Sequence, residues 1–357
     1  MKTRIENLKK ILSGKADCAL IINPVNRRYF TGMKSSAGYL LVFPEDACFI
    51  TDSRYIEHSR EVIRHCEVLE QERDFYVQIK KILNKHNAQT IAVESHDMTL
   101  KQYHKIQEKL PDFDVLGDSS LSRAIYALRT VKSPEEIRKI KAAQALAEHA
   151  LQALLEHLHV GMTEREVALE LDFHMRKNGA EDLSFETIAL TGAHSSMPHG
   201  VPDDRIIQQN SFVLMDFGAV VDGYHSDMTR TICVGRPSQE MQEVYEIVRN
   251  AQDAAKAAAR PGISGKALDA VARDLMTQAG YGEQFGHSLG HGVGLEIHEY
   301  PVVSMANSKI LEPGNVVTIE PGIYLPGKFG VRIEDFVYIT KNSCENLTNL
   351  TNTLVCV

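Results

Sequence analysis

Short apolar runs alternate with charged segments over the amino-terminal part of the chain. The apolar runs are residues 19–22, 39–43, 48–51 and 91–93. Such runs are typical of buried strands. The charged segments between them, such as residues 56–65, instead have the spacing of a helix. Strands that alternate with helices indicate an α/β domain, which we place at residues 1–127.

A new helix is predicted to begin at Ser133. Ser133 can cap the helix, Pro134 suits its first position, and Glu136 completes a capping box. Apolar residues then recur at three- and four-residue steps, at Ile137, Ile140, Ala143, Ala147, Leu151, Leu154 and Leu158. This spacing predicts a long helix that buries one stripe. We expect the helix to open a second domain, residues 128–357.

The second domain mixes helices with strands. Thr163 and Glu166 form another capping box, and the Asn-Gly pair at 178–179 can end that helix. Two more helices are predicted at residues 238–259 and 264–279. Strand-like runs cover residues 212–217, 224–234, 315–319 and 331–339. This mixture predicts an α+β domain.

Composition and charge exclude several classes of protein. The chain has 357 residues, of which 43% are hydrophobic and 24% charged, as in ordinary globular proteins. Acidic residues outnumber basic residues by 47 to 39, and no block of Lys or Arg is present to neutralise phosphates. We therefore expect no nucleic-acid partner.

Neither a membrane segment nor a secretion signal is expected. Charges at Lys2, Arg4 and Glu6 interrupt the amino terminus before a signal-like apolar run can form. The longest apolar runs are far shorter than the roughly 20 residues that cross a bilayer. The six cysteines form no Cys-x-x-Cys pair, which fits reduced thiols. We predict a cytoplasmic protein without a membrane partner.

The first candidate for chemistry is a pair of aspartates beside a tight turn. Asp222-Gly223 is a strong two-residue hairpin signal. In that register Asp216 lies opposite Thr229, so Asp216 and Asp227 are diagonal neighbours on one face. Two carboxylates would then point into one site. An ordinary surface hairpin with polar residues on its solvent face is the alternative.

The second candidate is a histidine, His291, flanked by glycines. The segment is not a dinucleotide fingerprint, because Leu295 stands where the third glycine belongs. A helical zinc motif that starts at His298 also fails, because Pro301 and Val302 follow. The flanking glycines allow a ligand to approach the backbone closely. Both histidines could also have only a structural role.

The third candidate is a pair of glutamates in apolar surroundings. Glu320 ends an apolar strand, and Glu334 lies within the apolar run 331–337. Charged glutamates are rarely buried unless they are paired or bind metal. A buried ion pair between Arg332 and one of these glutamates is the alternative reading.

Together these segments supply four carboxylates and one histidine. Without a cation, crowding would raise the pKa values of some of these carboxyl groups strongly. Two divalent ions would balance four negative charges. Oxygen-rich ligation without thiolate favours Mn²⁺, with Co²⁺, Fe²⁺ and Zn²⁺ as alternatives.

With these motifs in place, the sequence resembles the metallopeptidases of the creatinase and methionine aminopeptidase class. The likeness covers roughly residues 130–357, and the amino-terminal domain resembles that of Xaa-Pro aminopeptidases and prolidases. The family shares the ligand order Asp, Asp, His, Glu, Glu, which matches Asp216, Asp227, His291, Glu320 and Glu334. The shared elements also include Ser226-Asp227-x-Thr229-Arg230, Gly290-His291-Gly292, Glu320-Pro321-Gly322 and Arg332-x-Glu334.

The resemblance implies a pita-bread fold for the catalytic domain and a dinuclear metal centre within it. Asp216 and Asp227 would hold one metal, and His291 and Glu320 would hold the other. Asp227 and Glu334 would bridge the two ions. A hydroxide shared by the metals would then act as the nucleophile, because the cations lower the pKa of water.

The resemblance also implies residues that act on the substrate. Glu320 is the expected proton shuttle, and His199 and His298 would face the peptide and stabilise the developing oxyanion. We also place Arg332 among the substrate-binding residues. Apart from the resemblance, His199 could be a turn residue beside Pro198.

One departure from the family bears on the substrate. Prolidases that cut free dipeptides often carry an arginine just after the His-Glu-x-Pro stretch, whereas Val302 follows Pro301 here. We therefore predict an aminopeptidase that releases the residue before proline from longer peptides. A prolidase restricted to free Xaa-Pro dipeptides is the alternative. Relatives imply a homodimer.

Three other functions fit the sequence less well. A methionine aminopeptidase would share the metal ligands but would lack the first 125 or so residues. A creatinase-like hydrolase of small molecules normally lacks part of the ligand set, which is complete here. A non-enzymatic binding module on the same fold would also be expected to carry damaged ligands.

Overall fold

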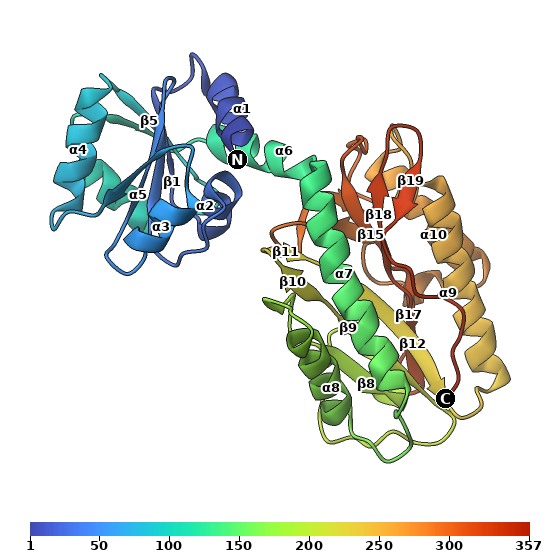
Figure 1. The fold of residues 1–357 in the computed structure, drawn as a ribbon. Helices are drawn as coiled ribbons and strands as arrows, with labels where there is room; N and C mark the ends of the chain where they lie inside the picture. Colours follow the sequence, from blue (N-terminus) through green and yellow to red (C-terminus); the bar gives the residue numbers. More distant parts are fainter. The chain divides into compact units, whose positions relative to one another are not determined.

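The computed structural model describes residues 1–357 and divides into two compact units, Met1–Arg129 and Thr130–Val357. Each unit has its own core (Figure 1). No helix is both long enough and apolar enough to pass through a membrane.

A six-stranded mixed sheet forms the centre of the amino-terminal unit, in the order β4-β3-β2-β1-β5-β6. Its strands are β1 (Cys18–Ile21), β2 (Tyr39–Val42), β3 (Ala47–Thr51), β4 (Glu67–Glu70), β5 (Thr90–Val93) and β6 (Asp114–Leu116). The helices are α1 (Lys2–Leu12), α2 (Pro24–Thr31), α3 (Ile56–Val62), α4 (Phe75–Lys85), α5 (Leu100–Lys109) and α6 (Ser120–Thr130). Every predicted apolar run contains a strand. The two strands without such a run, β4 and β6, lie at the two edges of the sheet, where each pairs with another strand on one side only.

Four long helices and several small sheets form the second unit. The helices are α7 (Pro134–Leu155), α8 (Glu164–Lys177), α9 (Gln239–Ala258) and α10 (Gly265–Gln278), with short 3₁₀ turns η1 (Gly192–Ser196) and η2 (Gly282–Gln284). The predicted caps are confirmed. Ser133 and Thr163 accept hydrogen bonds from the backbone N–H groups of Glu136 and Glu166, and both capping boxes are complete. All four predicted helices are present.

The strands of the second unit belong to four sheets. These have the orders β11-β10-β7, β12-β9-β8, β14-β13-β15-β18-β19 and β16-β17. The strands are β7 (Asp182–Leu183), β8 (Ile188–Thr191), β9 (Ser211–Phe217), β10 (Ala219–Val221), β11 (Tyr224–His225), β12 (Met228–Val234), β13 (Gly290–Gly292), β14 (Glu299–Val303), β15 (Val316–Ile319), β16 (Gly322–Leu325), β17 (Phe329–Arg332), β18 (Asp335–Ile339) and β19 (Cys344–Asn346).

Two predicted strands were wrong in extent. Residues 224–234 form β11 and β12 with a break at Ser226–Asp227, and residues 331–339 are divided between β17 and β18 at Ile333–Glu334. In both places the chain passes from one sheet to another, and a charged side chain of the candidate site lies at the break. An apolar run does not by itself reveal where a strand changes sheets.

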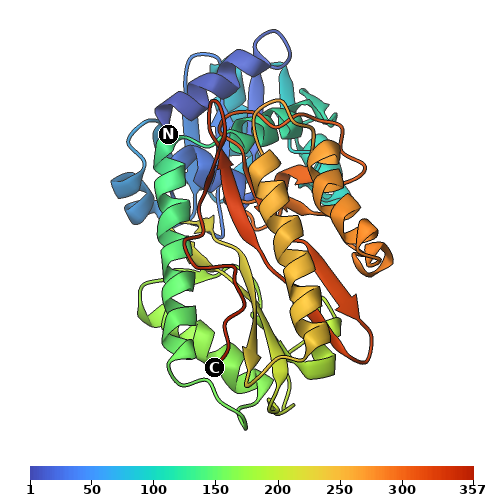
Figure 2. The ribbon, with the colours of Figure 1, turned by 90° about the vertical axis from the view of Figure 1, so that its right-hand side faces the viewer.

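Two apolar clusters hold the helices on the sheets. One joins α7 and α8 to β9 and β12, and the other joins α9 and α10 to β15, β16, β17 and β18. The segment after β19 runs between α7 and α9 (Figures 1 and 2). There Asn349 N donates to Glu148 of α7, and Asn352 Nδ2 donates to Gln252 of α9. The strands between these helix pairs therefore have a rigid support.

In the amino-terminal unit, the carboxyl group of Glu94 is buried at the start of α2. It accepts hydrogen bonds from Ile22 N at 2.6 Å, Asn23 N at 2.9 Å and Asn26 Nδ2 at 2.7 Å, at the start of α2. Burial nevertheless raises the pKa of Glu94 from 4.5 to about 7, against the opposite effect of these hydrogen bonds. The folded chain therefore holds a proton on Glu94 more tightly than the unfolded chain does.

We predict that Glu94→Gln flattens the dependence of stability on pH. A raised folded-state pKa stabilises the protein fully below pH 4.5, and this contribution is lost as pH rises through about 7. The loss is on the order of 3 kcal/mol, and the neutral amide removes it. Urea denaturation between pH 5 and 8 measures the slope. Glu67→Gln, at an exposed position on β4, is the control. An unchanged slope in Glu94→Gln would contradict the assignment.

Candidate active site

One cavity in the second unit, of about 610 Å³, is lined by every site residue that the sequence predicts. These residues are His199, Asp216, Asp227, His291, His298, Glu320, Arg332 and Glu334. Apolar side chains, among them Phe185, Ile188 and Val302, complete the lining. The lining of the cavity thus combines charged and apolar side chains.

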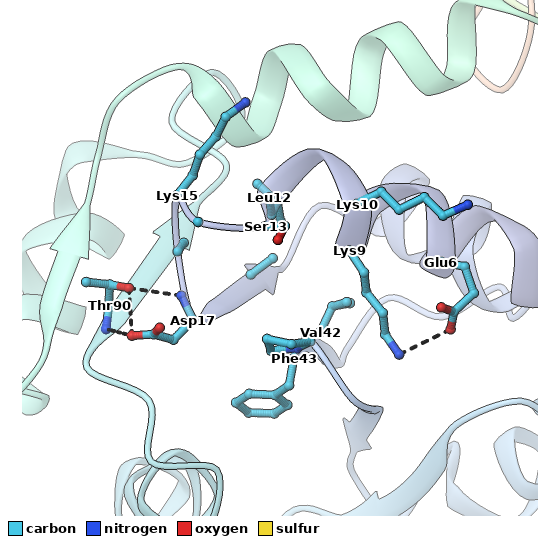
Figure 3. Close-up of a pocket in the computed structure, with 14 residues that line it drawn as sticks. Glu6, Lys9, Lys10, Leu12, Ser13, Lys15, Asp17, Val42, Phe43 and Thr90 are labelled. Carbon is cyan, nitrogen blue, oxygen red and sulfur yellow. Dashed lines mark hydrogen bonds and ion pairs between the residues drawn. The ribbon is translucent and has the colours of Figure 1, made fainter.

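A second cavity, of about 710 Å³, lies in the amino-terminal unit (Figure 3). Three of its charged groups, Glu6, Lys9 and Asp17, have partners within the protein. Lys9 pairs with Glu6 at 3.2 Å, and Asp17 accepts hydrogen bonds from Gln89 N and Thr90 N. The larger cavity therefore lacks the converging acids and histidines of the smaller one.

Asp216 and Asp227 reach the cavity from an antiparallel ribbon. Asp216 on β9 pairs with Thr229 on β12, so the predicted register is confirmed. Asp227 immediately precedes β12 and faces the same side as Asp216. Gly218 lies between these elements, where a Cβ atom would come within 2.0 Å of Ser226 O. A side chain at position 218 would push apart the two chain segments that carry Asp216 and Asp227.

His291 lies on β13, an inner strand between β14 and β15. Cβ atoms at Gly290 and Gly292 would meet the carbonyl oxygens of Thr318 at 2.0 Å and Tyr300 at 2.4 Å. The flanking glycines therefore let neighbouring strands close on His291. Its Nδ1 is 3.1 Å from Gly292 O, so Nδ1 carries the proton and the Nε2 lone pair faces the acids.

The Nε2 atom of His291 lies among carboxylates. It is 3.5 Å from Asp227 Oδ2 and 3.4 Å from Glu320 Oε1. Burial lowers the pKa of His291, which favours the neutral imidazole that metals bind. The donor atoms of Asp227, His291 and Glu334 all lie within 4.8 Å of one another.

Glu320 and Glu334 lie on facing segments of the chain, between the pair Ile319–Asp335 of β15 and β18 and the pair Gly322–Arg332 of β16 and β17. Glu320 follows β15, and Glu334 lies between β17 and β18, where its N–H donates to Thr229 O at 3.1 Å. Thr229 Oγ1 donates to Glu334 Oε2 at 2.7 Å, and Thr318 Oγ1 donates to Glu320 Oε1 at 2.9 Å. Each glutamate is thus oriented by a threonine hydroxyl.

The crowded carboxyl groups of this cluster need a cation to balance their negative charge. Burial, followed by the charges of Asp216 and Glu320, raises the pKa of Asp227 well above its usual range. Burial, followed by the charge of Asp227, does the same to the pKa of Glu334. Asp216 Oδ1 and Glu334 Oε1 are buried without a hydrogen-bond partner. Oxygen-rich donors, one imidazole and orphaned carboxylate oxygens fit divalent metal ions.

Each of the three side-chain nitrogens of Arg332 donates a hydrogen bond to the protein. Its Nη2 donates to Asp216 at 2.6 Å, its Nη1 to Tyr324 Oη at 2.8 Å, and its Nε to Thr229 Oγ1 at 2.9 Å. The ion pair left open for Arg332 is therefore with Asp216, not with Glu320 or Glu334. The guanidinium orients one carboxylate while it lines the cavity.

His199 and His298 lie at the cavity beside the acidic cluster. The ring centroids of His298 and His291 are 4.3 Å apart, and burial lowers the pKa of His298. His199 follows η1, in the loop between β8 and β9. Both histidines can therefore face a peptide that occupies the cavity.

Sequence reasoning missed several supporting residues. His287 Nε2 lies 3.0 Å from Tyr324 Oη, and both residues line the cavity. Lys132 forms a buried ion pair with Glu299 at 2.6 Å, directly after His298. Thr229 belongs to a motif that the sequence analysis named, but its contacts with Glu334 and Arg332 were not predicted. The partner of Lys132 is 167 residues away, which no local pattern reveals.

Comparison with known proteins agrees with this geometry. Residues 138–341 match the model of metallopeptidase family M24, and residues 4–131 match the creatinase/prolidase N-terminal domain. The chain is 39% identical to a Xaa-Pro dipeptidase of Pyrococcus furiosus over 98% of both chains.

Solved structures of two other proteins have the same fold as this chain. A Xaa-Pro dipeptidase from Bacillus anthracis superposes with a TM-score of 0.95, at 38% identity and 99% coverage of both chains. An X-Pro aminopeptidase from Thermotoga maritima gives 0.91 at 39% identity, covering 96% of this chain and 98% of the other. The predicted α/β amino-terminal domain and α+β pita-bread domain are confirmed. The chain therefore belongs to metallopeptidase family M24 and is a peptidase.

Proposed function

We propose that this peptidase hydrolyses the bond between an amino-terminal residue and a following proline, with two metal ions. One observation carries the proposal: five candidate metal-ligand residues in the family order line a single cavity together with His199 and His298. The named relatives act on Xaa-Pro substrates according to their names. The catalytic groups all belong to residues 128–357, which we propose as the catalytic domain.

In this proposal Asp216 and Asp227 hold one ion, and His291 and Glu320 hold the other. Asp227 and Glu334 would each supply carboxylate oxygens to both ions. When bound, the pair of divalent ions supplies an activated water as nucleophile and polarises the scissile carbonyl. The carboxylate-rich donor set favours manganese.

The remaining steps are assigned to side chains of this chain. Glu320 moves the proton to the leaving imino nitrogen of proline. His199 and His298 donate hydrogen bonds to the oxygen that gains charge in the transition state. Arg332 keeps Asp216 in place and lines the substrate cavity.

Longer peptides are the proposed substrates. A free dipeptide carries a carboxylate close to its proline, and a cation is needed to hold it. Val302 is apolar, and the guanidinium of Arg332 already has three protein partners. The second candidate is a dipeptidase, which the names of the Pyrococcus and Bacillus relatives favour. A cytoplasmic homodimer completes the proposal.

We predict metal-dependent turnover of a Xaa-Pro-Pro tripeptide. With Mn²⁺ the protein should cleave the tripeptide faster than a Lys-Pro dipeptide and should leave a Met-initiated peptide without proline uncut. A chelator should abolish turnover and added Mn²⁺ should restore it. A faster dipeptide reaction would support the second candidate. Turnover of none of the peptides would favour a binding module instead.

We predict that His199→Ala and His298→Ala each lower kcat by about 10²- to 10³-fold, the usual effect of removing one oxyanion donor. Neither variant should change the metal content, because neither histidine is an assigned ligand. Steady-state kinetics and elemental analysis give the two readouts. His149→Ala, at an exposed position on α7, is the control. Full activity in both active-site variants would exclude the assigned roles.

We predict that Arg332→Lys weakens metal binding by about 10- to 100-fold, as expected for loss of a group that orients a ligand. A lysine ammonium cannot reproduce three directed contacts from one planar group. Titration of metal-stripped protein with Mn²⁺ measures the affinity. Arg176→Lys, which changes an exposed ion pair with Asp182, should leave the affinity unchanged. Equal affinities of Arg332→Lys and wild type would refute the orienting role.

A further inference from the structure

Glu164, the first residue of α8, is a buried acid outside the active-site cavity. Its side chain is 0% exposed. Oε1 accepts a hydrogen bond from Thr191 N at 2.7 Å, and Oε2 accepts one from Asp203 N at 3.2 Å. His194 Nδ1 lies 2.9 Å from Oε1 and 2.8 Å from Oε2. One carboxylate therefore binds three separate points of the chain.

These three points bracket the loop that carries His199. Thr191 ends β8, His194 lies in η1, and Asp203 lies four residues beyond His199. Glu164 thus ties the beginning and the end of the loop to the rigid start of α8. The loop is also tied to β17, because Gly330 N donates to Ser195 Oγ at 2.8 Å.

The ring of His194 packs against the backbone next to His199. A Cβ atom on Gly200 would come within 3.2 Å of His194 Nε2 and 2.8 Å of Leu190 Cδ1. Gly200 therefore lies directly on His194, and a displaced imidazole would leave the neighbouring His199 without its support. The chain of contacts runs from Glu164 through His194 to the residue that follows His199.

The acids and the histidine of this cluster also have donor atoms within 4.8 Å of one another, as a metal site would. Their contacts argue for a different role. Both oxygens of Glu164 already accept hydrogen bonds from N–H groups. The guanidinium of Arg205 pairs with Asp203 and lies 3.2 Å from His194 Nδ1. The cluster is therefore satisfied by protein donors and carries its own cation.

We propose that Glu164 and His194 are positioning residues that hold His199 at the substrate. This inference rests on the proposed function, because it assigns His199 a role in the reaction. Glu164→Gln retains the size of the side chain, but its amide –NH₂ would face an N–H group at Thr191 or at Asp203. One side-chain tie to the loop and the charged partner of His194 are then lost, whereas the backbone bonds of Glu164 N to Arg205 O and of Arg165 N to Asp203 O remain, so the loop stays attached but holds His199 less firmly.

The test compares Glu164→Gln with Glu166→Gln. Glu166 lies in the same first turn of α8 and is exposed, and its carboxylate binds Thr163 N but no residue of the loop. We expect kcat/KM for a Xaa-Pro-Pro tripeptide to fall about 10- to 100-fold in Glu164→Gln, mainly through kcat. The control should stay within about twofold of wild type. Equal activity of Glu164→Gln and wild type would overturn the proposal.

A double-mutant cycle separates positioning from general destabilisation. In a His199→Ala background, Glu164→Gln should lower kcat/KM by less than about twofold, although it lowers the melting temperature as much as it does in wild type. An equal fold-loss in both backgrounds would show that Glu164 does not act through His199. Selective loss of a metal ion from Glu164→Gln would instead identify the cluster as a metal site and overturn the proposal.

Substitutions of His194 provide an independent check if Glu164→Gln folds poorly. Asparagine can place a donor near the position of Nδ1, so His194→Asn should retain most of the activity that His194→Ala loses. Equal loss in both variants would contradict the role of the Glu164 contact. Wild-type protein that cleaves no Xaa-Pro peptide would refute the proposed function itself, whereas active wild type with unaffected variants refutes only the positioning role.

Discussion

Four carboxylates that share one buried cavity impose the strongest constraint on this molecule. Asp216, Asp227, Glu320 and Glu334 face one another with a single arginine, Arg332, among them. Burial and mutual repulsion raise the pKa values of three of these acids. One positive charge cannot balance four negative charges. In the function that we propose, a pair of divalent ions would remove this imbalance and make the cluster a catalytic centre.

The scaffold brings these acids together from four places along the chain. The β9–β12 ribbon sets the register of the aspartates, and Gly218 permits its close approach. Threonine hydroxyls orient the two glutamates, and Thr229 also contacts Arg332. The helix pairs packed on these strands give the ligands little freedom to move apart. Rigid support of this kind is what a metal centre requires of its protein.

Local rules explain which parts of the site were predictable from sequence. The orientation of Asp216 and Asp227 followed from a two-residue turn and the period-two alternation of strands. Glu320 and Glu334 could not be placed in this way, because the loop at residues 325–329 leaves the register between their strands open in the sequence. Their grouping was expected only from the family resemblance. Contacts between distant segments, such as Arg332 with Asp216, depend on tertiary packing and leave no trace in local spacing.

The number of metal ions bound by catalytically active protein tests the central claim most directly. Elemental analysis of protein that turns over a Xaa-Pro peptide should find two divalent ions per chain, and Asp227→Asn, which removes a bridging charge, should lose both ions together with activity. Full turnover by protein that contains no stoichiometric metal would contradict the account.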